Sequence, residues 1–217
     1  MDNLSAQIAF LAIAAVPLLL AITLHEAAHA YAARYFGDHT AEKMGRISLN
    51  PLRHIDPFGT VILPLLLFLT SGFWFGYAKP VPVDFGRLRR PKEDMLWVAL
   101  AGPAANFAMT IGWALIGALA RVLPLFGYNN ALLVMCGTGV LINLMLMFLN
   151  LIPLPPLDGG RIATSLLPLP LARRYARLEP FGIAIIFLLA FSGLLGAFLA
   201  PLIQGTAFWL NSLLSFS

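Results

Sequence analysis

The chain has 217 residues, of which 59% are hydrophobic and 11% charged, with a net charge of +4 and a mean hydropathy of +0.83. Because soluble domains carry about 25% charged residues, this composition excludes an ordinary soluble enzyme and indicates a polytopic membrane protein. The pI near 9.6 does not indicate a nucleic-acid partner, because the basic residues are confined to loops between apolar runs. The length suits a single domain, without a separate soluble module.

The first predicted membrane helix, residues 6–35, carries the sequence HEAAH near its inner end. Each ionisable side chain at membrane depth costs about 2.5–3.5 kcal/mol or more, so this cluster needs a compensating partner. His25 and His29 are four residues apart, on one face of a helix, and can bind one Zn²⁺ while Glu26 reaches a water molecule. A polar seam between helices is the alternative. We disfavour it, because HExxH seldom arises by chance in a chain so poor in histidine.

The next apolar run, residues 58–75, lies between two basic loops. If it crossed the membrane, the basic loop 79–92 would be external, against the positive-inside rule. Asp158 would then also lie on the opposite side from HEAAH. A segment that enters the membrane and returns removes both conflicts. Pro64, Gly72 and Gly76, followed by the alternating sequence KPVPVD, predict a broken helix with a short strand or hairpin. An ordinary crossing helix stays the alternative.

Two further membrane helices are predicted over residues 95–120 and 131–152. The first begins with small residues around GPAAN, and we interpret Asn106 there as part of close helix packing. In the second, Asn143 is expected to make a structural hydrogen bond across helices. Beyond it, an apolar span over residues 181–200 and a shorter apolar stretch from residue 207 to the end form the predicted C-terminal region.

The third zinc ligand is sought among the acidic residues, because a catalytic zinc usually has three protein ligands and one open position. Most acids of this chain lie in basic loops, where a solvated charge needs no special explanation. Asp158 differs, since it lies in NLIPLPPLDGG between an apolar run and two glycines. Prolines break the preceding helix there, and glycines permit a close approach of the backbone. A helix N-cap is the alternative role for Asp158.

Three motifs in this order, HEAAH, GPAAN and NLIPLPPLDGG, resemble the site-2 protease family of intramembrane zinc metalloproteases. The chain looks like the minimal prokaryotic type without a PDZ or CBS domain. The resemblance implies that His25, His29 and Asp158 bind zinc, that Glu26 is the catalytic acid/base, and that Asn150 contacts the substrate backbone or the developing oxyanion. FGYAKPVPVD resembles the family's re-entrant strand region, which implies substrate-binding roles for Lys79, Pro80, Val81 and Pro82. A plain connecting loop is the alternative for this stretch.

We therefore predict an all-α polytopic membrane protein with about five to six membrane segments and a small re-entrant strand or hairpin. Residues 1–217 would form one membrane-embedded metalloprotease domain, with a core over 6–165 and C-terminal apolar helices over 181–217. It would bind one Zn²⁺ per chain and cut transmembrane protein substrates within or beside their membrane segments. We expect a multi-pass protein of a cell membrane, a bacterial inner membrane, with its active site toward the cytoplasm.

The expected partners are the lipid bilayer and the substrate, without nucleic acid; a homo-oligomer or a regulatory membrane partner stays open. Two other functions also stay open. A metal transporter would place more ionisable residues within its membrane helices than this chain has. A non-catalytic membrane scaffold would have no need of Glu26.

Overall fold

The computed structural model describes residues 2–62, 66, 79–123 and 129–214. Its helices confirm the predicted all-α polytopic class. Four of them are long and apolar enough to cross a membrane, namely Ile8–Tyr35, Pro91–Val122, Asn130–Asn150 and Leu194–Leu213. A shorter apolar helix covers Glu179–Phe191. No strand is present in the part of the chain that is described.

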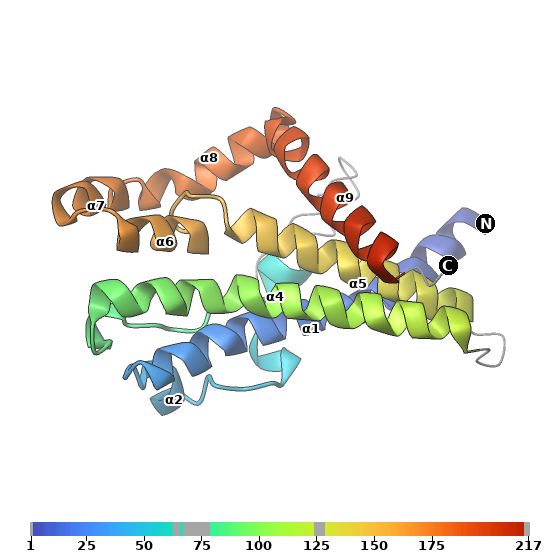
Figure 1. The fold of residues 1–217 in the computed structure, drawn as a ribbon, viewed down its shortest axis with the longest axis horizontal. Helices are drawn as coiled ribbons and strands as arrows, with labels where there is room; N and C mark the ends of the chain where they lie inside the picture. The colour runs from blue at the N-terminus through green and yellow to red at the C-terminus, as the bar shows by residue number, and fades with distance from the viewer. Residues whose placement is uncertain (1, 63–65, 67–78, 124–128, 215–217) are drawn as a thin grey trace.

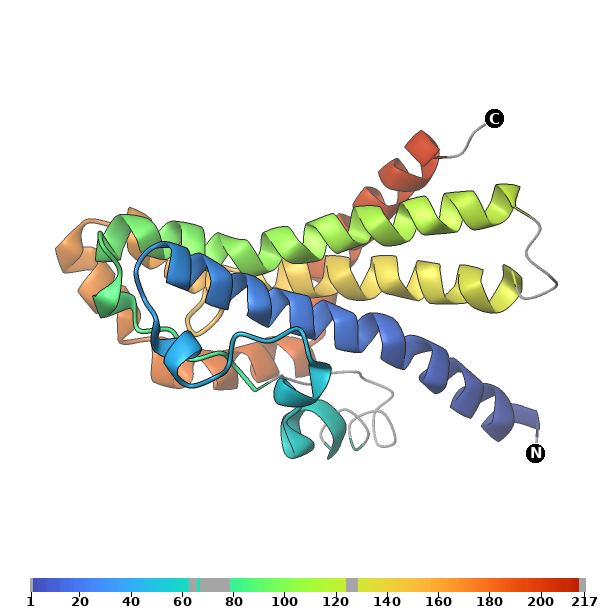
Figure 2. The same ribbon diagram turned by 90° about the horizontal axis from the view of Figure 1, so that it is seen from below.

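The core consists of α1 (Asp2–Tyr35), α4 (Pro91–Val122) and α5 (Asn129–Asn150), which lie alongside one another (Figures 1 and 2). Small residues bring these helices close together, because a short side chain lets two backbones approach. A Cβ atom at Gly139 of α5 would overlap the Trp113 ring of α4, so this glycine makes room for the indole. Ala21 of α1 and Ala99 of α4 are almost completely buried.

The connection from α1 to α4 begins and ends at the same end of the bundle, so it makes no net crossing (Figure 2). It contains α2 (Thr40–Lys43) and the short turns η1 (Pro51–Arg53), η2 (Pro57–Ile62) and η3 (Phe85–Arg87). Most of the predicted re-entrant run 58–75 lies outside the described residues. This common end places HEAAH and Asp158 on one side, as the charge pattern requires.

The extended stretch expected near KPVPVD has no regular secondary structure over residues 79–84, which we call the strap. Pro80 and Pro82 have no N–H group, so neither can donate to a sheet ladder. This explains why the strap follows α1 as an irregular segment rather than as a paired strand. The hairpin partner would fall in residues 63–78, which are mostly outside the described residues.

The predicted single span over 181–200 is wrong, because the chain breaks there into α8 (Glu179–Phe191) and α9 (Leu194–Leu214). Gly193 lies at the break with φ +77°, a left-handed conformation that favours glycine. Of the shorter apolar stretch predicted from residue 207 to the end, residues 207–214 belong to α9 and the rest lies outside the described residues. Ile186 of α8 packs with Leu195 and Leu199 of α9.

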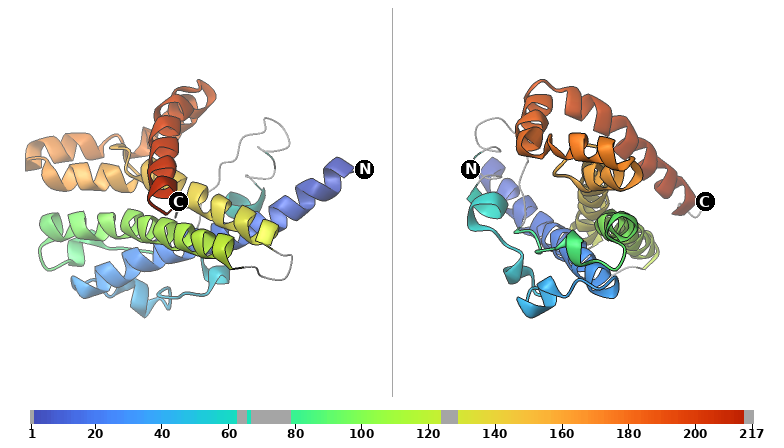
Figure 3. Two further views of the ribbon diagram at one scale, coloured as in Figure 1. Left: turned by 45° about the vertical axis from the view of Figure 1, so that its right-hand side comes forward. Right: turned by 90° about the vertical axis from the view of Figure 1, so that its left-hand side faces the viewer.

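Two short helices, α6 (Asp158–Leu166) and α7 (Leu169–Ala176), lie at the end of the bundle where α4 begins (Figures 1 and 3). The loop between α5 and α6 is tightly packed. A Cβ at Gly159 would overlap the carbonyl oxygens of Leu151 and Ile152, and a Cβ at Gly182 of α8 would overlap the Pro155 carbonyl. Gly159 and Gly160 therefore permit a close approach of the backbone, as predicted. The segment that approaches them is the loop between α5 and α6.

Candidate metal centre

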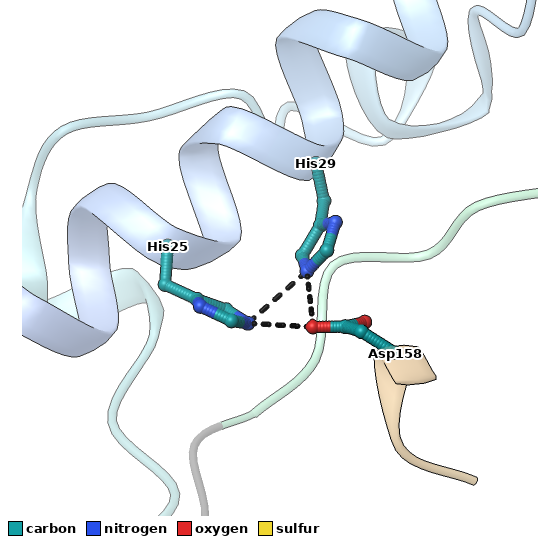
Figure 4. Close-up of side chains that lie close together, drawn as sticks. All are labelled: His25, His29 and Asp158. Carbon is teal, nitrogen blue, oxygen red and sulfur yellow. Dashed lines mark hydrogen bonds and ion pairs between the residues drawn. The ribbon is translucent and has the colours of Figure 1, made fainter. Parts of the chain in front are cut away.

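Three atoms that can bind a metal ion converge between α1 and the first residue of α6 (Figure 4). The Nε2 atoms of His25 and His29 are 3.1 Å apart. Asp158 Oδ2 lies 3.3 Å from each of them. The structure thus brings together the three residues predicted as metal ligands, although Asp158 lies more than 120 positions after the histidines in the sequence.

Helix α4 provides a hydrogen-bond acceptor for the Nδ1 atom of each imidazole ring, the nitrogen that does not face Asp158. His29 Nδ1 donates to the backbone carbonyl of Val98 at 2.7 Å. His25 Nδ1 donates to Asn106 Oδ1 at 2.5 Å. Since carbonyl oxygens only accept hydrogen bonds, each Nδ1 carries the proton and each Nε2 keeps its lone pair. We infer these tautomers from the hydrogen-bond partners, and they are the forms that bind metal ions.

A buried relay of two amides fixes the orientation of Asn106. Its Nδ2 donates to Asn143 Oδ1 at 3.0 Å and to the Ala21 carbonyl at 3.4 Å. Asn143 Nδ2 donates in turn to the Gly139 carbonyl at 2.8 Å. Because the relay ends on backbone carbonyls, Asn106 must present its oxygen to His25. The cross-helix hydrogen bond expected of Asn143 is confirmed, whereas our interpretation of Asn106 as packing alone missed this role.

The donor set fits a zinc ion. Two lone pairs and a carboxylate oxygen face one another here, and Asp158 Oδ2 is buried without a hydrogen-bond partner among the described residues. Such a triangle is repulsive unless a cation neutralises it. In a tetrahedral site with zinc–ligand distances of about 2.0–2.1 Å, ligand atoms lie about 3.3 Å apart. The three observed separations of 3.1, 3.3 and 3.3 Å agree with that geometry.

Gly102 of α4 provides the space for both histidine rings. A Cβ atom at this position would overlap the imidazoles of His25 and His29. From the sequence, the small residues around GPAAN predict close helix packing, and the motif supports the family resemblance, but neither predicts a contact between Gly102 and the histidines. A helical glycine in a run of alanines carries no sign of which side chain it faces, so this requirement emerges only from the folded arrangement.

Glu26 contacts the strap. Its Oε2 accepts a hydrogen bond from the Val81 N–H at 2.7 Å. Arg46 Nη2 donates to the carbonyls of Lys79 and Pro80 at 3.1 and 3.4 Å, which fixes the start of the strap. Of the four strap residues predicted to bind substrate, Val81 is the one whose backbone reaches the HEAAH motif.

Asp38 fixes the other end of the strap, where its Oδ2 accepts from the Asp84 N–H at 2.7 Å. Burial raises the pKa of the Asp38 carboxyl, but hydrogen bonds from the Thr40 hydroxyl, the Thr40 N–H and the Asp84 N–H outweigh it. The pKa of Asp38 therefore lies below its ordinary value. The carboxylate stays ionised at neutral pH and holds the strap against the end of α1.

Asn150 lies at the C-terminal end of α5. Its Nδ2 donates to the Leu146 carbonyl of the same helix at 3.0 Å. This contact uses one hydrogen of the Asn150 side-chain amide, and the side-chain carbonyl oxygen takes no part in it. A role for Asn150 toward a substrate stays a prediction.

Replacing Asn106 by Leu should weaken zinc binding by about 10–100-fold, the usual effect of removing the support of a histidine ligand. The change removes the acceptor that keeps the His25 proton on Nδ1. Metal content after dialysis against graded chelator measures the effect. Thr110→Val is the matched control, because Thr110 is equally buried on α4 and donates only to the Asn106 backbone carbonyl. Equal zinc retention in the two variants would contradict this role.

Comparisons with known proteins agree with the chemistry of this site. The model of Peptidase family M50 matches residues 127–193. The "Putative zinc metalloprotease YwhC" of Bacillus subtilis is 38% identical over 191 residues, covering 84% of this chain and 81% of the relative. The "Putative zinc metalloprotease Rip2" of Mycobacterium tuberculosis is 33% identical over 202 residues, covering 90% and 71%.

A more distant relative, "Zinc metalloprotease MJ0392" of Methanocaldococcus jannaschii, is 27% identical over 175 residues, covering 81% of this chain and 39% of the relative. No solved structure matches the chain significantly. The extent of the bacterial matches and the convergent His–His–Asp group lead to one conclusion: the chain belongs to peptidase family M50, the site-2 protease family, and is a zinc metallopeptidase.

Proposed function

We propose that this protein is an intramembrane endopeptidase that cuts peptide bonds within or beside the transmembrane segments of other membrane proteins. His25, His29 and Asp158 would hold one zinc ion, and Glu26 would act as the acid/base. The observation that carries the proposal is the triangle of two imidazole nitrogens and one carboxylate oxygen. It lies within a bundle of helices that are apolar enough to span a membrane.

Glu26 would carry out the proton transfer, as the residue between the two histidines of HEAAH. When bound, zinc supplies Lewis-acid polarisation of the scissile carbonyl and makes water more acidic. The Val81 N–H holds Glu26 Oε2 and so fixes the carboxylate, while Oε1 can take a proton from the attacking water. The same carboxyl group then delivers that proton to the leaving amine.

The strap provides an edge for an unwound substrate. A membrane helix has all its peptide groups hydrogen-bonded internally, so its carbonyls are not open to attack until it unwinds locally. Within the described residues, the Val83 N–H and the carbonyls of Val81 and Pro82 are not used by the contacts that hold the strap. An extended peptide could pair with these groups and be carried toward Glu26. Asn150 would hold a further backbone group that unwinding has freed.

The distribution of charge supports a cytoplasmic active site in a cell membrane. Basic residues cluster on α7, at the start of α4 and near the end of α1, all at the end of the bundle that carries α6 (Figure 3). Arg121 marks the opposite end. By the positive-inside rule, the α6 end faces the cytoplasm. One metalloprotease domain, with a core over 6–165, would then contain the whole site.

The Asp158→Ala variant tests the ligand assignment. The purified parent should retain about one zinc per chain, the stoichiometry of a single catalytic site. It should also cleave a membrane-protein substrate at a bond inside or next to its apolar segment. The variant should lose most of its zinc and its activity, because two ligands on one helix bind much more weakly than three. Elemental analysis and mass spectrometry of the cleavage products measure both.

Glu179→Ala is the control, since Glu179 is an exposed carboxylate at the same end of the molecule. If Asp158→Ala keeps the parent's metal content, Asp158 is not a ligand. If the parent cuts only soluble peptides, the membrane-substrate proposal fails.

A further inference from the structure

An open polar pocket lies beside the strap, lined by residues from the end of α2, the turn η1 and the start of the strap. Its volume is about 490 Å³. Three cationic side chains line it, those of Arg46, Arg53 and Lys79. Apolar side chains, those of Met44, Leu52 and Ile55, form the rest of its wall. The pocket is separate from the metal centre and shares no residue with it.

Among the described residues, no carboxylate forms an ion pair with Arg46, Arg53 or Lys79. Arg46 Nε is buried and has no hydrogen-bond partner among the described residues. Arg53 Nη1 donates to the Gly45 carbonyl, so this guanidinium contacts a neutral group rather than a carboxylate. Asp56, the next acid along the chain, accepts from the Phe58 and Gly59 N–H groups at the start of η2. Three neighbouring cations with an unpaired buried donor are favourable for an anion.

The apolar wall indicates which kind of anion fits. Leu52 is 75% exposed and Met44 is 63% exposed, beside the cationic groups. A small soluble anion would gain nothing from these side chains. A phospholipid would use both parts of the pocket, because its phosphate meets the cations while its acyl chain covers the apolar surface.

We propose that this pocket binds the phosphate of an anionic phospholipid. The bound lipid also acts on the strap, because Arg46 donates to the carbonyls of Lys79 and Pro80. The next residue, Val81, holds the Glu26 carboxylate. A lipid that pairs with Arg46 therefore steadies the segment that orients Glu26. This effect on cleavage depends on the proposed function, whereas lipid binding does not.

Lipid retention tests the site directly. Native mass spectrometry of the purified protein, incubated in detergent with phosphatidylglycerol or phosphatidylcholine, should show preferential retention of phosphatidylglycerol. Arg53→Gln should weaken that retention about fivefold, the factor expected for one basic residue at an anionic lipid surface. Arg53→Lys should retain most of it, because the charge is kept. Arg173→Gln on α7 is the matched control, since it removes the same charge outside the pocket.

Several results would overturn the lipid site. One is equal retention of the two lipids by the parent, and another is equal loss in the Arg53→Gln and Arg173→Gln variants. If Arg53→Gln does not fold, Leu52→Gln replaces it: this variant should weaken phosphatidylglycerol retention and leave glycerol phosphate binding unchanged. If inorganic phosphate competes away the lipid at low millimolar concentration, the occupant is a soluble anion and the lipid proposal fails.

Activity in lipid nanodiscs provides the second measurement. Cleavage by the parent should be faster in nanodiscs with phosphatidylglycerol than in phosphatidylcholine alone, and Arg53→Gln should reduce this difference while keeping the rate in phosphatidylcholine. Selective lipid retention without cleavage of any substrate would leave the lipid site intact and count against the proposed function alone. Selective retention with equal cleavage in both nanodiscs would overturn the coupling through Arg46.

Discussion

Replacing Glu26 by Gln should lower the rate of peptide-bond cleavage by about 10²–10⁴-fold, the range that general acid–base catalysis contributes. Glutamine has nearly the same shape and keeps an oxygen that can accept from the Val81 N–H. It cannot take a proton from water at neutral pH. The strap and the metal centre should therefore persist while proton transfer is lost.

Single-turnover cleavage of a membrane substrate measures the rate, and elemental analysis measures zinc. Glu93→Gln is the matched control, because Glu93 is an exposed carboxylate paired with Arg90 at the start of α4. A Glu26→Gln variant that has lost its zinc would show that the glutamate supports the metal site rather than the reaction. A Glu26→Gln variant as active as the parent would favour a non-catalytic role for the HEAAH motif as a whole.

Replacing Gly102 by Ala should lower zinc affinity by about 100-fold, the upper end of the losses seen when the surroundings of a metal ligand are disturbed. The added methyl group would overlap the rings of His25 and His29. The histidines must then turn away from Asp158. Alanine favours a helix over glycine by about 1 kcal/mol, so α4 itself should form at least as well in the variant.

Gly112→Ala provides the control on the same helix, because a Cβ there meets no atom within 4 Å. It should keep zinc and activity. Competition with a fluorescent zinc chelator measures affinity in both variants, and circular dichroism verifies helix content. If Gly102→Ala binds zinc as tightly as Gly112→Ala, the histidine rings do not occupy the observed positions in the metal-bound protein.

The parts of this molecule that sequence predicts well are those fixed by local spacing. His25 and His29 meet because four residues make about one helical turn, and Asp158 could be selected because its prolines and glycines set it apart from the loop acids. The long apolar runs likewise predict membrane helices by length alone. None of these inferences requires knowing which helices are neighbours.

The parts that sequence did not predict depend on tertiary contacts. Asn106 supports His25, and Gly102 admits both rings, because α4 packs on α1 in one particular register. Neither role can be recognised from the sequence of α4 alone. At Gly193 the sequence predicts helix packing or a bend within one span rather than a break into two helices, since α8 and α9 are both apolar. The strap lacks the predicted strand because its prolines remove the donors that pairing needs.

The assignment of two ligands to α1 and one to α6 has a thermodynamic consequence. With the proposed ligands, a chain inserted in the membrane but not yet packed would offer zinc only the histidine pair, and full zinc affinity would arise when α6 reaches its place. By linkage, zinc at about 1,000 times its dissociation constant would add about 4.1 kcal/mol to the stability of the packed state. Zinc occupancy and helix assembly are then one equilibrium. When zinc is scarce, the packed position of α6 would lose this stabilisation as well as the activity.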